Sequence, residues 1–441
     1  MTSNLGIKIK RLRKEQNMTQ SQLAAPKISK SMLSQIENGL AMPSMKNLQF
    51  IANKLNKPIS YFLDDIPSDI SSDNVSKLYD GIMMELRSVD NLINDAEFKE
   101  ALDSLDKLEH KASLSRNNKL LADILYRRGI CLLSTAEFDD AEKLLKRACE
   151  IYIKNINYIE AAKAYMKISL RALRNFDIEE CIKIYEQSKE IYNKSPSRDI
   201  HFEIELLNNL AKSHSAKGDF VKALEYLNNA LDISNNTGIY YKADEIHRLT
   251  AYIYFCQDDY ENFKVNIEKA EQFADFSDNK NAIYLILIYK AMYENSAGNY
   301  KKALEYLEDI INRKCSLDHF YYREKSITLY FMEDYEEALA NIKLVDYSAP
   351  LNYKIDYLIL WSSKIYEALI YSQMNDLNKA LEYILMGIDK MRRFDNSKLL
   401  VFALESASKI YYKIGNLEEA YKYLKEANDM SKIIIRDKVY F

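Results

Sequence analysis

A short pattern of residues recurs along most of this chain at intervals close to 40 residues. In each copy an aromatic or aliphatic residue is followed, three positions later, by a residue that is usually small. The nine copies are Phe98/Ala101, Phe138/Ala141, Ile178/Cys181, Phe220/Ala223, Tyr260/Phe263, Tyr300/Ala303, Tyr335/Ala338, Leu377/Ala380 and Leu417/Ala420. Their first members lie 40, 40, 42, 40, 40, 35, 42 and 40 residues apart. A period of this length indicates stacked supersecondary units that bury their apolar faces against one another.

Composition indicates that these units are helical. The 441 residues include only 9 Gly and 6 Pro, while 48% are hydrophobic and 29% are charged. So few turn-forming residues favour long helices joined by short connections. In the copies AKGDFVKALEYLNNAL and SAGNYKKALEYLEDI, Gly218 and Gly298 are expected at the turn between two helices. We therefore predict an all-α fold with about nine helical pairs from residue 75 to about residue 434.

The repeated units resemble tetratricopeptide repeats, lengthened from the usual 34 residues to about 40. The third and fifth copies depart most from that family, because Cys181 and Phe263 stand where Ala is expected. The resemblance implies a right-handed α-solenoid over residues 75–441. The first helices of such a solenoid line a concave groove that accepts an extended peptide or a partner helix.

Polar and aromatic residues fall at the predicted groove positions of the central units. An Asn amide there can pair with both the N–H and the C=O of a peptide backbone, and an Arg can hold a carboxylate with two hydrogen bonds. Each residue could equally be an ordinary solvated surface residue, although their clustering in consecutive units favours binding. The candidate peptide-binding residues are Asn208, Asn209, Lys212, Glu245, Arg248, Tyr252, Tyr289, Asn295 and Arg323.

A second pattern, MTQSQLAAPKISKSMLSQIENG, spans Met18 to Gly39 and predicts two short helices joined by a tight turn. Thr19 and Ser29 are the expected N-cap residues, and Pro26 is expected to end the first helix. In the second helix, Leu33 and Ile36 form the expected buried stripe. The side chains expected to point outward there, as candidate base readers, are Lys30, Ser31, Met32 and Gln35.

Further short helices are expected on either side of this pair. A basic amphipathic helix containing Ile9 and Leu12 precedes it, and Ser44 is expected to cap a fourth helix. Pro58 is expected to open a fifth helix that runs through Leu63. The acidic stretch DDIPSDISSDN at residues 64–74 has no apolar period and is predicted to be a linker. The predicted N-terminal domain therefore covers residues 1–63.

From Leu5 to Leu63 the chain resembles the XRE, or lambda-repressor-like, helix-turn-helix domains. The words MTQSQLA, SKSMLSQIENG and PSMKNLQFIANKL carry the resemblance. It implies that Gln20 contacts a DNA phosphate and that Lys30, Ser31 and Gln35 contact bases. The turn at residues 25–28 is one residue shorter than is usual in the family and lacks its Gly, which leaves the pose of the reading helix open. The full set of candidate DNA-binding residues is Thr19, Gln20, Ser29, Lys30, Ser31, Met32, Gln35, Asn38 and Lys46.

Charge is distributed unevenly between the two predicted parts. Residues 1–63 contain eight Lys and two Arg against two Glu, a net charge of +8. Because the whole chain carries −4, the remaining residues carry −12. A basic head on an acidic body predicts that the head, and not the body, binds nucleic acid.

No catalytic or metal-binding constellation is apparent in the sequence. The five His form no HExxH motif, the five Cys form no CxxC motif, and neither a Gly-rich phosphate loop nor a nucleophile elbow is present. We expect no cofactor, no metal and no enzymatic activity, and we expect reduced, mostly buried thiols. The longest apolar run, residues 282–289, is far shorter than a membrane span, so a soluble cytoplasmic protein is expected.

A helix-turn-helix head followed by a long tetratricopeptide-like array resembles the peptide-responsive RNPP regulators of low-GC Gram-positive bacteria. The resemblance implies a homodimeric transcription factor that binds operator DNA, and whose array binds a short signalling peptide that alters DNA binding. Quorum sensing, with sporulation or virulence as its output, is the implied setting. The alternative is a scaffold that sequesters a protein partner, such as a response regulator, with or without DNA binding.

Overall fold

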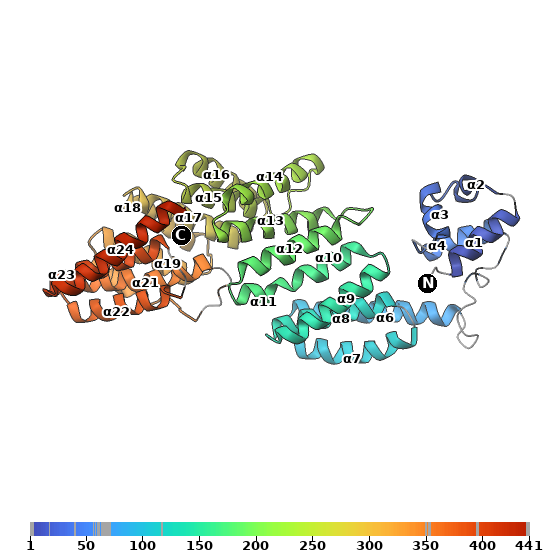
Figure 1. Ribbon diagram of the computed structural model, residues 1–441, viewed down its shortest axis with the longest axis horizontal. Coiled ribbons are helices and arrows are strands. Elements are labelled where there is room, and N and C mark those ends of the chain that lie inside the picture. Colours follow the sequence, from blue (N-terminus) through green and yellow to red (C-terminus); the bar gives the residue numbers. More distant parts are fainter. Residues whose placement is uncertain are drawn as a thin grey trace. The chain divides into compact units, whose positions relative to one another are not determined.

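The computed structural model describes residues 4–16, 18–38, 41–55, 57, 59, 62, 72–115, 118–348, 351, 354–393 and 397–437. These residues form helices and connecting turns, with no strand among them (Figure 1). Their contacts divide the chain into two compact units. The first unit comprises residues 1–168 and 190–196, and the second comprises residues 169–189 and 197–441.

In the described part of the N-terminal region of the first unit there are four short helices, and three of them begin directly after the N-cap residues expected from the sequence. Thr19 caps α2 with a reciprocal capping box to Gln22, Ser29 caps α3, and Ser44 caps α4. A side-chain oxygen satisfies an otherwise unpaired N–H in each first turn. The fifth predicted helix and the end at Gly39 lie largely outside the described residues. The helices are α1 (Asn4–Glu15), α2 (Gln20–Ala24), α3 (Lys30–Glu37) and α4 (Met45–Lys54).

These four helices enclose one small apolar core, and its composition confirms the predicted buried stripes. Leu33 and Ile36 of α3 are buried in it. Helix α1 approaches the end of α3 closely at Gly6, where an added Cβ would lie 2.2 Å from the backbone oxygen of Ile36. Gly6 therefore fixes how α3 is held against α1. The core consists of Ile9, Leu12, Leu23, Ala24, Ile28, Leu33, Ile36, Leu48, Ile51, Ala52, Leu55 and Phe62.

Helical pairs make up the rest of the first unit. Helix α6 begins at Ser72, inside the stretch that the sequence predicts as a linker, and the remainder of that stretch lies outside the described residues. The helices are α6 (Ser72–Asn94), α7 (Phe98–Ser115), α8 (Asn118–Ser134), α9 (Phe138–Lys154) and α10 (Tyr158–Lys167). Helix α10 ends at Lys167 with Ile168 as its C-cap, and α11 (Ser169–Arg174) starts at the next residue, in the second unit.

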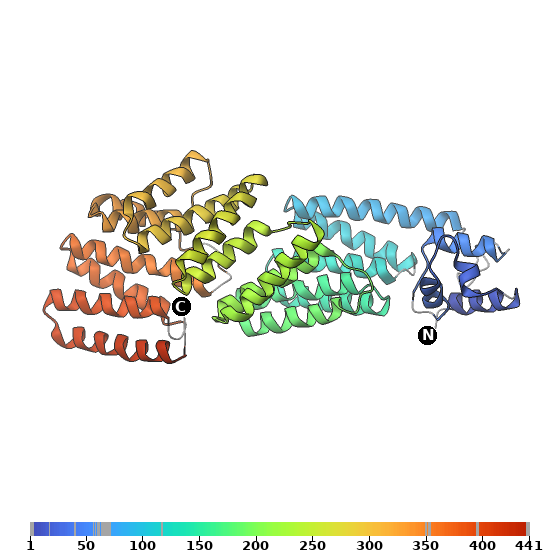
Figure 2. The same ribbon diagram turned by 90° about the horizontal axis from the view of Figure 1, so that it is seen from above.

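The second unit continues the same arrangement, and consecutive helices lie antiparallel and side by side within it (Figure 2). Helix α12 (Ile178–Tyr192) contributes residues to both units. The further helices are α13 (Ile200–Lys217), α14 (Phe220–Thr237), α15 (Ala243–Cys256), α16 (Tyr260–Phe276), α17 (Lys280–Ser296), α18 (Tyr300–Asn312), α19 (His319–Phe331), α20 (Tyr335–Ile342), α21 (Lys354–Gln373), α22 (Leu377–Met391), α23 (Lys398–Ile414) and α24 (Leu417–Asp437).

The recurring pattern of the sequence marks the start of the second helix in every pair. The first member of each copy is the first residue of α7, α9, α12, α14, α16, α18, α20, α22 or α24. The residue three positions later is buried in every pair, because it faces the preceding helix. Phe263 is the large exception, and its ring is 2% exposed and stacked on Tyr293 with centroids 5.0 Å apart. The predicted repeats are therefore confirmed, including the copy that departs most.

A residue with positive φ lies in most of the turns within the pairs. Gly218 has φ 86° and Gly298 has φ 77°, as expected at turns where Gly avoids a steric penalty. Elsewhere a residue with a side chain takes the same conformation, for example Ala96 with φ 61°. The array therefore needs few glycines, which explains how so Gly-poor a chain makes so many turns.

Candidate functional site

Helix α3 presents a polar face that the apolar core leaves exposed. Lys30, Ser31, Met32 and Gln35 are exposed, whereas Leu33 and Ile36 on the opposite side are buried. Thr19, Ser29, Asn38 and Lys46 are exposed as well, and Asn38 accepts a hydrogen bond from Lys10 Nζ at 3.3 Å. The structure thus gathers an exposed polar set along α3 and its flanks.

A buried ion pair braces α3 against α1. Arg13 donates from Nε and Nη2 to the two carboxylate oxygens of Glu37, at 2.5 and 2.8 Å. Gln20 Nε2 donates to Glu37 Oε2 at 2.9 Å, so the side chain expected to contact a phosphate is held by the same carboxylate. Burial would raise the pKa of Glu37, but its hydrogen bonds from Arg13 and Gln20 hold that pKa below its usual value. A fixed α3 is what reading base edges requires.

A cavity of about 320 Å³ opens in the second unit, where first helices of five consecutive pairs meet. It lies between α13, α15, α17, α19 and α21. A volume of this size is within the range of small-ligand and peptide side-chain pockets, about 300 to 1,000 Å³. Its lining is mostly apolar with a few charged groups: Lys212, Ser215, Ala216, Arg248, Leu249, Tyr252, Leu285, Ile288, Tyr289, Met292, Phe320, Ile355, Asp356 and Ile359.

Four of the nine candidate groove residues line this cavity, and a fifth is ion-paired at its edge. Lys212, Arg248, Tyr252 and Tyr289 are lining residues. Glu245 pairs with Lys212, and its second oxygen lies 3.3 Å from Lys242 Nζ. Burial would raise the pKa of Glu245, but the two Lys hold it at about 2. Glu245 therefore stays ionised and neutralises Lys212.

Arg248 has no such carboxylate partner among the described residues. Its Nη1 donates to the Tyr289 hydroxyl at 3.1 Å, and its guanidinium centre lies 5.5 Å from the Tyr289 ring centroid. The Tyr252 ring lies 5.4 Å from the Tyr289 ring and completes this wall. Arg248 makes no ion pair with a described carboxylate, although Asp356 and Glu245 lie near enough for their charges to interact with it.

Asp356 is the residue of this site that the sequence did not single out. It lies on α21, the first helix of the eighth pair, and lines the cavity together with Ile355 and Ile359. Burial raises the pKa of Asp356 to about 6, although the nearby charges of Arg248 and Lys212 oppose the rise. The intervals around the seventh copy are 35 and then 42 residues, so the spacing of the copies does not show which residues of α21 face the groove.

The other four candidate residues do not line the cavity. Asn208 is fully buried on α13, one turn before Lys212, and neither its amide nitrogen nor its oxygen is hydrogen-bonded to a described residue. Asn209 is half-buried on the same helix. Asn295 is buried and accepts a hydrogen bond from the Thr328 hydroxyl at 3.0 Å.

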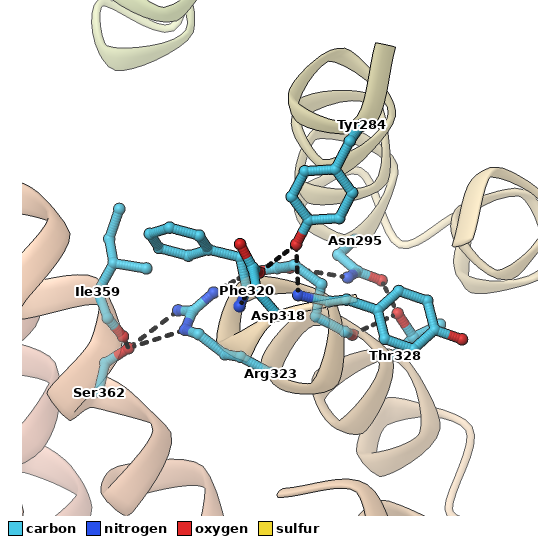
Figure 3. Close-up of polar contacts among 10 residues, drawn as sticks. Tyr284, Asn295, Asp318, Phe320, Arg323, Thr328, Ile359 and Ser362 are labelled. Atoms are coloured by element: carbon cyan, nitrogen blue, oxygen red, sulfur yellow. Dashed lines mark hydrogen bonds and ion pairs between the residues drawn. The ribbon is translucent and has the colours of Figure 1, made fainter. Parts of the chain in front are cut away.

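Arg323, the last of the four, is buried between α19 and α21. Its Nε and Nη2 donate to the Ser362 hydroxyl at 3.1 and 2.9 Å, and its Nη1 pairs with Glu324 (Figure 3). Phe320 and Ile359, which line the cavity, lie beside this cluster in Figure 3. In this arrangement Arg323 joins two helices that carry lining residues, and its donors are occupied.

The described cysteines and helices show two further properties of the chain. All five Cys are free thiols, and Cys131, Cys149, Cys181 and Cys315 are buried, as predicted. Burial raises the pKa of Cys149 to about 11 and that of Cys181 to about 12, which disfavours the reactive thiolate. None of the helices in the described part of the chain is long and apolar enough to cross a bilayer.

Comparison with known families agrees with this architecture. Residues 9–62 match the helix-turn-helix family, and residues 160–236 and 403–433 match tetratricopeptide repeats. The fold therefore defines the class of protein: a helix-turn-helix head followed by tetratricopeptide-like repeats. No curated protein matches the sequence of the chain.

Within that class, several solved structures share the fold. The apo form of the quorum sensor NprR from Bacillus thuringiensis is 12% identical, with a TM-score of 0.55, and the match covers 80% of this chain and 99% of NprR. The apo form of RapI is 14% identical, with a TM-score of 0.56, and the match covers 80% of this chain and 98% of RapI. NprR in complex with its cognate peptide NprX is 13% identical with a TM-score of 0.51, and the match covers 82% and 99% of the two chains. At these identities the likeness concerns the fold.

Proposed function

We propose that this chain is a sequence-specific, DNA-binding transcriptional regulator whose repeat array binds a short signalling peptide, and that the peptide changes its affinity for DNA. Residues 1–63 form the DNA-binding part, and residues 75–441 form the peptide-binding and dimerisation part. The observation that carries the proposal is the cavity that five first helices share, with Arg248 and Asp356 in its lining. The relatives of known structure include NprR with a bound peptide.

The exposed face of α3 supports the DNA-binding half of the proposal. Lys30, Ser31 and Gln35 are exposed on a helix that a buried ion pair fixes in place. Side chains of these types hydrogen-bond base edges in the major groove, and Lys46 with the caps Thr19 and Ser29 suits the flanking phosphates. The basic charge of the head adds the nonspecific attraction.

The cavity lining indicates the chemistry of the ligand. Ten aliphatic or aromatic side chains, including Leu285, Met292 and Phe320, offer an apolar surface for one or two peptide side chains. Arg248 suits a ligand carboxylate, since no described carboxylate forms an ion pair with its guanidinium. Asp356 suits an ammonium or guanidinium group, which would relieve the cost of a buried carboxylate. A short peptide that carries apolar side chains, one negative charge and one positive charge would match the apolar lining, Arg248 and Asp356.

Coupling between peptide and DNA follows from linkage. A peptide that binds one arrangement of the array more tightly shifts the protein toward that arrangement, and the DNA affinity changes with it. The regulator acts as a cytoplasmic homodimer, because two heads on a symmetric dimer recognise two half-sites of an operator. Signalling of this kind is quorum sensing; catalysis has no role in it.

The experiment that tests the proposal selects peptides and DNA against the full chain. A displayed library of random heptapeptides is selected for binding to the wild-type chain, and peptides that also bind the Arg248→Ala variant are removed. In a separate selection, random duplex DNA is enriched for binding to the wild-type chain. The expected result is a family of peptides that share a charged and apolar pattern and compete for one site.

A matched control distinguishes loss of the cavity arginine from loss of a surface arginine. Arg392→Ala removes a surface arginine that pairs with Glu426 and lies outside the cavity, so it should retain every selected peptide. Enrichment of no peptide that depends on Arg248, together with capture of a folded protein partner that survives Arg248→Ala, would favour the scaffold alternative.

A further inference from the structure

The fifth repeat carries an aromatic ring where the other repeats carry a small side chain. Three residues after the start of each copy, seven copies have Ala and the third has Cys, whereas the fifth has Phe263. The Phe263 ring is 2% exposed, and its centroid lies 5.7 Å from that of Phe255 on α15 and 5.0 Å from that of Tyr293 on α17. On α16, a large ring therefore packs against two other helices at a position where most pairs have only a methyl group.

Phe263 also lines a narrow gap beneath the cavity. The gap is too small for a water molecule, and it lies between α15, α16 and α17. Tyr252, Tyr289 and Met292 line both the gap and the cavity, and we call these three side chains the floor. Phe255 and Phe263 line the gap but not the cavity. Phe263 is therefore behind the floor, where its size determines how much space lies beneath it.

The floor is also the part of the cavity that holds Arg248. Its Nη1 donates to the Tyr289 hydroxyl at 3.1 Å, and its guanidinium centre lies 5.5 Å from the Tyr289 ring centroid. The same Tyr289 side chain lines the gap. A ligand whose carboxylate binds Arg248 consequently has its neighbouring apolar group next to the floor.

Aromatic and thioether surfaces surround the gap, so it suits an apolar group. Met is unbranched and flexible, which lets Met292 adjust to a group that enters from the cavity. In this chain the Phe263 ring prevents such entry, since it leaves so little space beneath the floor. An Ala at this position would leave an apolar pocket, and apolar pockets of this kind stay dry and bind small aromatic molecules.

We propose that Phe263 determines the specificity of the peptide site by closing a side-chain subsite beneath the floor. An apolar side chain of the ligand packs on Tyr252, Tyr289 and Met292 and reaches no deeper. The peptide class that this geometry selects has an aliphatic residue, such as leucine, isoleucine or valine, next to the group that binds Arg248. An aromatic ring at that place is too large, because a closed apolar pocket discriminates by size.

This inference rests on the proposed function, because it names the class of peptide that the cavity binds. The experiment has one part with peptides and one part with a small molecule. A chain that binds no peptide therefore still gives a result for the subsite, and the two failures are distinguishable.

The peptide part compares the full wild-type chain with Phe263→Ala, which introduces the residue of most other repeats. The same random heptapeptide library is selected on both chains, and dissociation constants are measured for peptide pairs that differ only in leucine or tryptophan at the apolar position. Wild type is expected to prefer leucine. In Phe263→Ala the ratio of the two constants is expected to shift toward tryptophan by at least about tenfold. Because both peptides are measured on the same chain, a general loss of stability cancels in this ratio.

Phe220→Ala is the matched control. Phe220 is also 2% exposed, but it lies on α14, from which no described residue lines the cavity. The leucine-to-tryptophan ratio of this variant is expected to stay within about twofold of wild type. Phe263→Leu removes less volume and is expected to shift the ratio toward tryptophan by about fivefold, so it replaces Phe263→Ala if circular dichroism shows that variant to be unfolded. An unchanged ratio in a folded Phe263 variant would overturn the proposal and leave peptide binding itself intact.

The small-molecule part uses 3-phenylpropionate, whose carboxylate suits Arg248 and whose ring suits the space that Phe263→Ala opens. Titration calorimetry is expected to show at least about tenfold tighter binding by Phe263→Ala than by wild type or Phe220→Ala, and loss of that gain in Phe263→Ala/Arg248→Ala. If the library yields no peptide that depends on Arg248, the proposed function fails, and this gain alone upholds the subsite. Equal binding of 3-phenylpropionate by wild type and Phe263→Ala would overturn the subsite.

Discussion

Arg248 on α15 donates a hydrogen bond to the Tyr289 hydroxyl on α17, at 3.1 Å, and its guanidinium lies against the Tyr289 ring. The tyrosine positions the cation without neutralising it. By contrast, Lys212 in the same cavity is already paired with Glu245. The cavity therefore contains one cation that a hydrogen bond holds in place and that makes no ion pair with a described carboxylate, which is why Arg248 is central to the proposed peptide site.

Arg248→Ala is expected to weaken binding of a selected peptide by about 1.5 to 3 kcal/mol, the usual range for a hydrogen bond to a charged group. Tyr289→Phe keeps the ring and removes only the hydrogen bond, so a smaller loss of about 0.5 to 1.5 kcal/mol is expected. Titration calorimetry with one peptide measures both. Equal affinities for wild type and Arg248→Ala would remove Arg248 from the site.

Asp356 makes folding stability depend on pH in a definite direction. Its pKa is about 6 in the folded chain, above the ordinary value of 3.8. The folded state therefore disfavours the ionised carboxyl, and stability from this group falls as pH rises from about 4 to about 6. Asp356→Asn is expected to raise the free energy of unfolding at pH 7.5 by about 1 to 2 kcal/mol and to change little at pH 4. Denaturant unfolding of the second unit at both pH values measures this difference.

The same carboxyl predicts how peptide binding depends on pH. A peptide with a lysine or arginine near Asp356 should bind more weakly as pH falls from 7 to 5, because Asp356 takes up a proton. Asp356→Asn should bind that peptide weakly at both pH values. A wild-type pH profile that persists unchanged in Asp356→Asn would place the titrating group elsewhere.

Glu37→Gln is expected to loosen α3 within the head. It leaves the Arg13 guanidinium buried without its carboxylate, a change that costs about 3 to 5 kcal/mol for a fully buried pair. Hydrogen exchange of the α1 and α3 amides in the full chain should accelerate while exchange in the second unit stays the same. Glu15→Gln alters an exposed pair with Arg11 and serves as the control, for which no acceleration is expected.

Lys30→Ala and Gln35→Ala are each expected to weaken binding to the selected operator by about 1 to 3 kcal/mol and to relax the preference at one base pair. Gln49→Ala on α4 is the control, because its amide is exposed and bonded to Asn53 within its own helix. Fluorescence anisotropy with operator variants measures both effects. Operator binding that is unaffected in both variants would exclude α3 as the reading helix.

Local chemistry made the repeats and caps predictable from the sequence. The aromatic or aliphatic residue of each copy is the first residue of a helix. One turn later the small residue packs against the preceding helix. Thr19, Ser29 and Ser44 cap helices because their side chains satisfy nearby N–H groups. Such features depend on neighbours within four residues.

The features that the sequence did not predict depend on contacts between residues far apart in the chain. The break after α10 at Ile168 lies in a stretch without Gly or Pro, so no local signal marks it. Asp356 lines the cavity because of how α21 is oriented against the preceding helices, which the sequence spacing does not show. Asn295 and Arg323 occupy candidate groove positions in the sequence, but each is hydrogen-bonded to a residue of a neighbouring helix, Asn295 to Thr328 on α19 and Arg323 to Ser362 on α21. Spacing alone does not distinguish a groove position from a buried one.

The most direct test of the central proposal measures operator affinity of the full chain with and without a saturating selected peptide, and peptide affinity with and without saturating operator. Linkage requires the two ratios to be equal. The expected result is the same change in both, about 5-fold to 150-fold, and its loss in Arg248→Ala. Operator affinity that is unchanged by a peptide bound in the cavity would contradict peptide control of DNA binding.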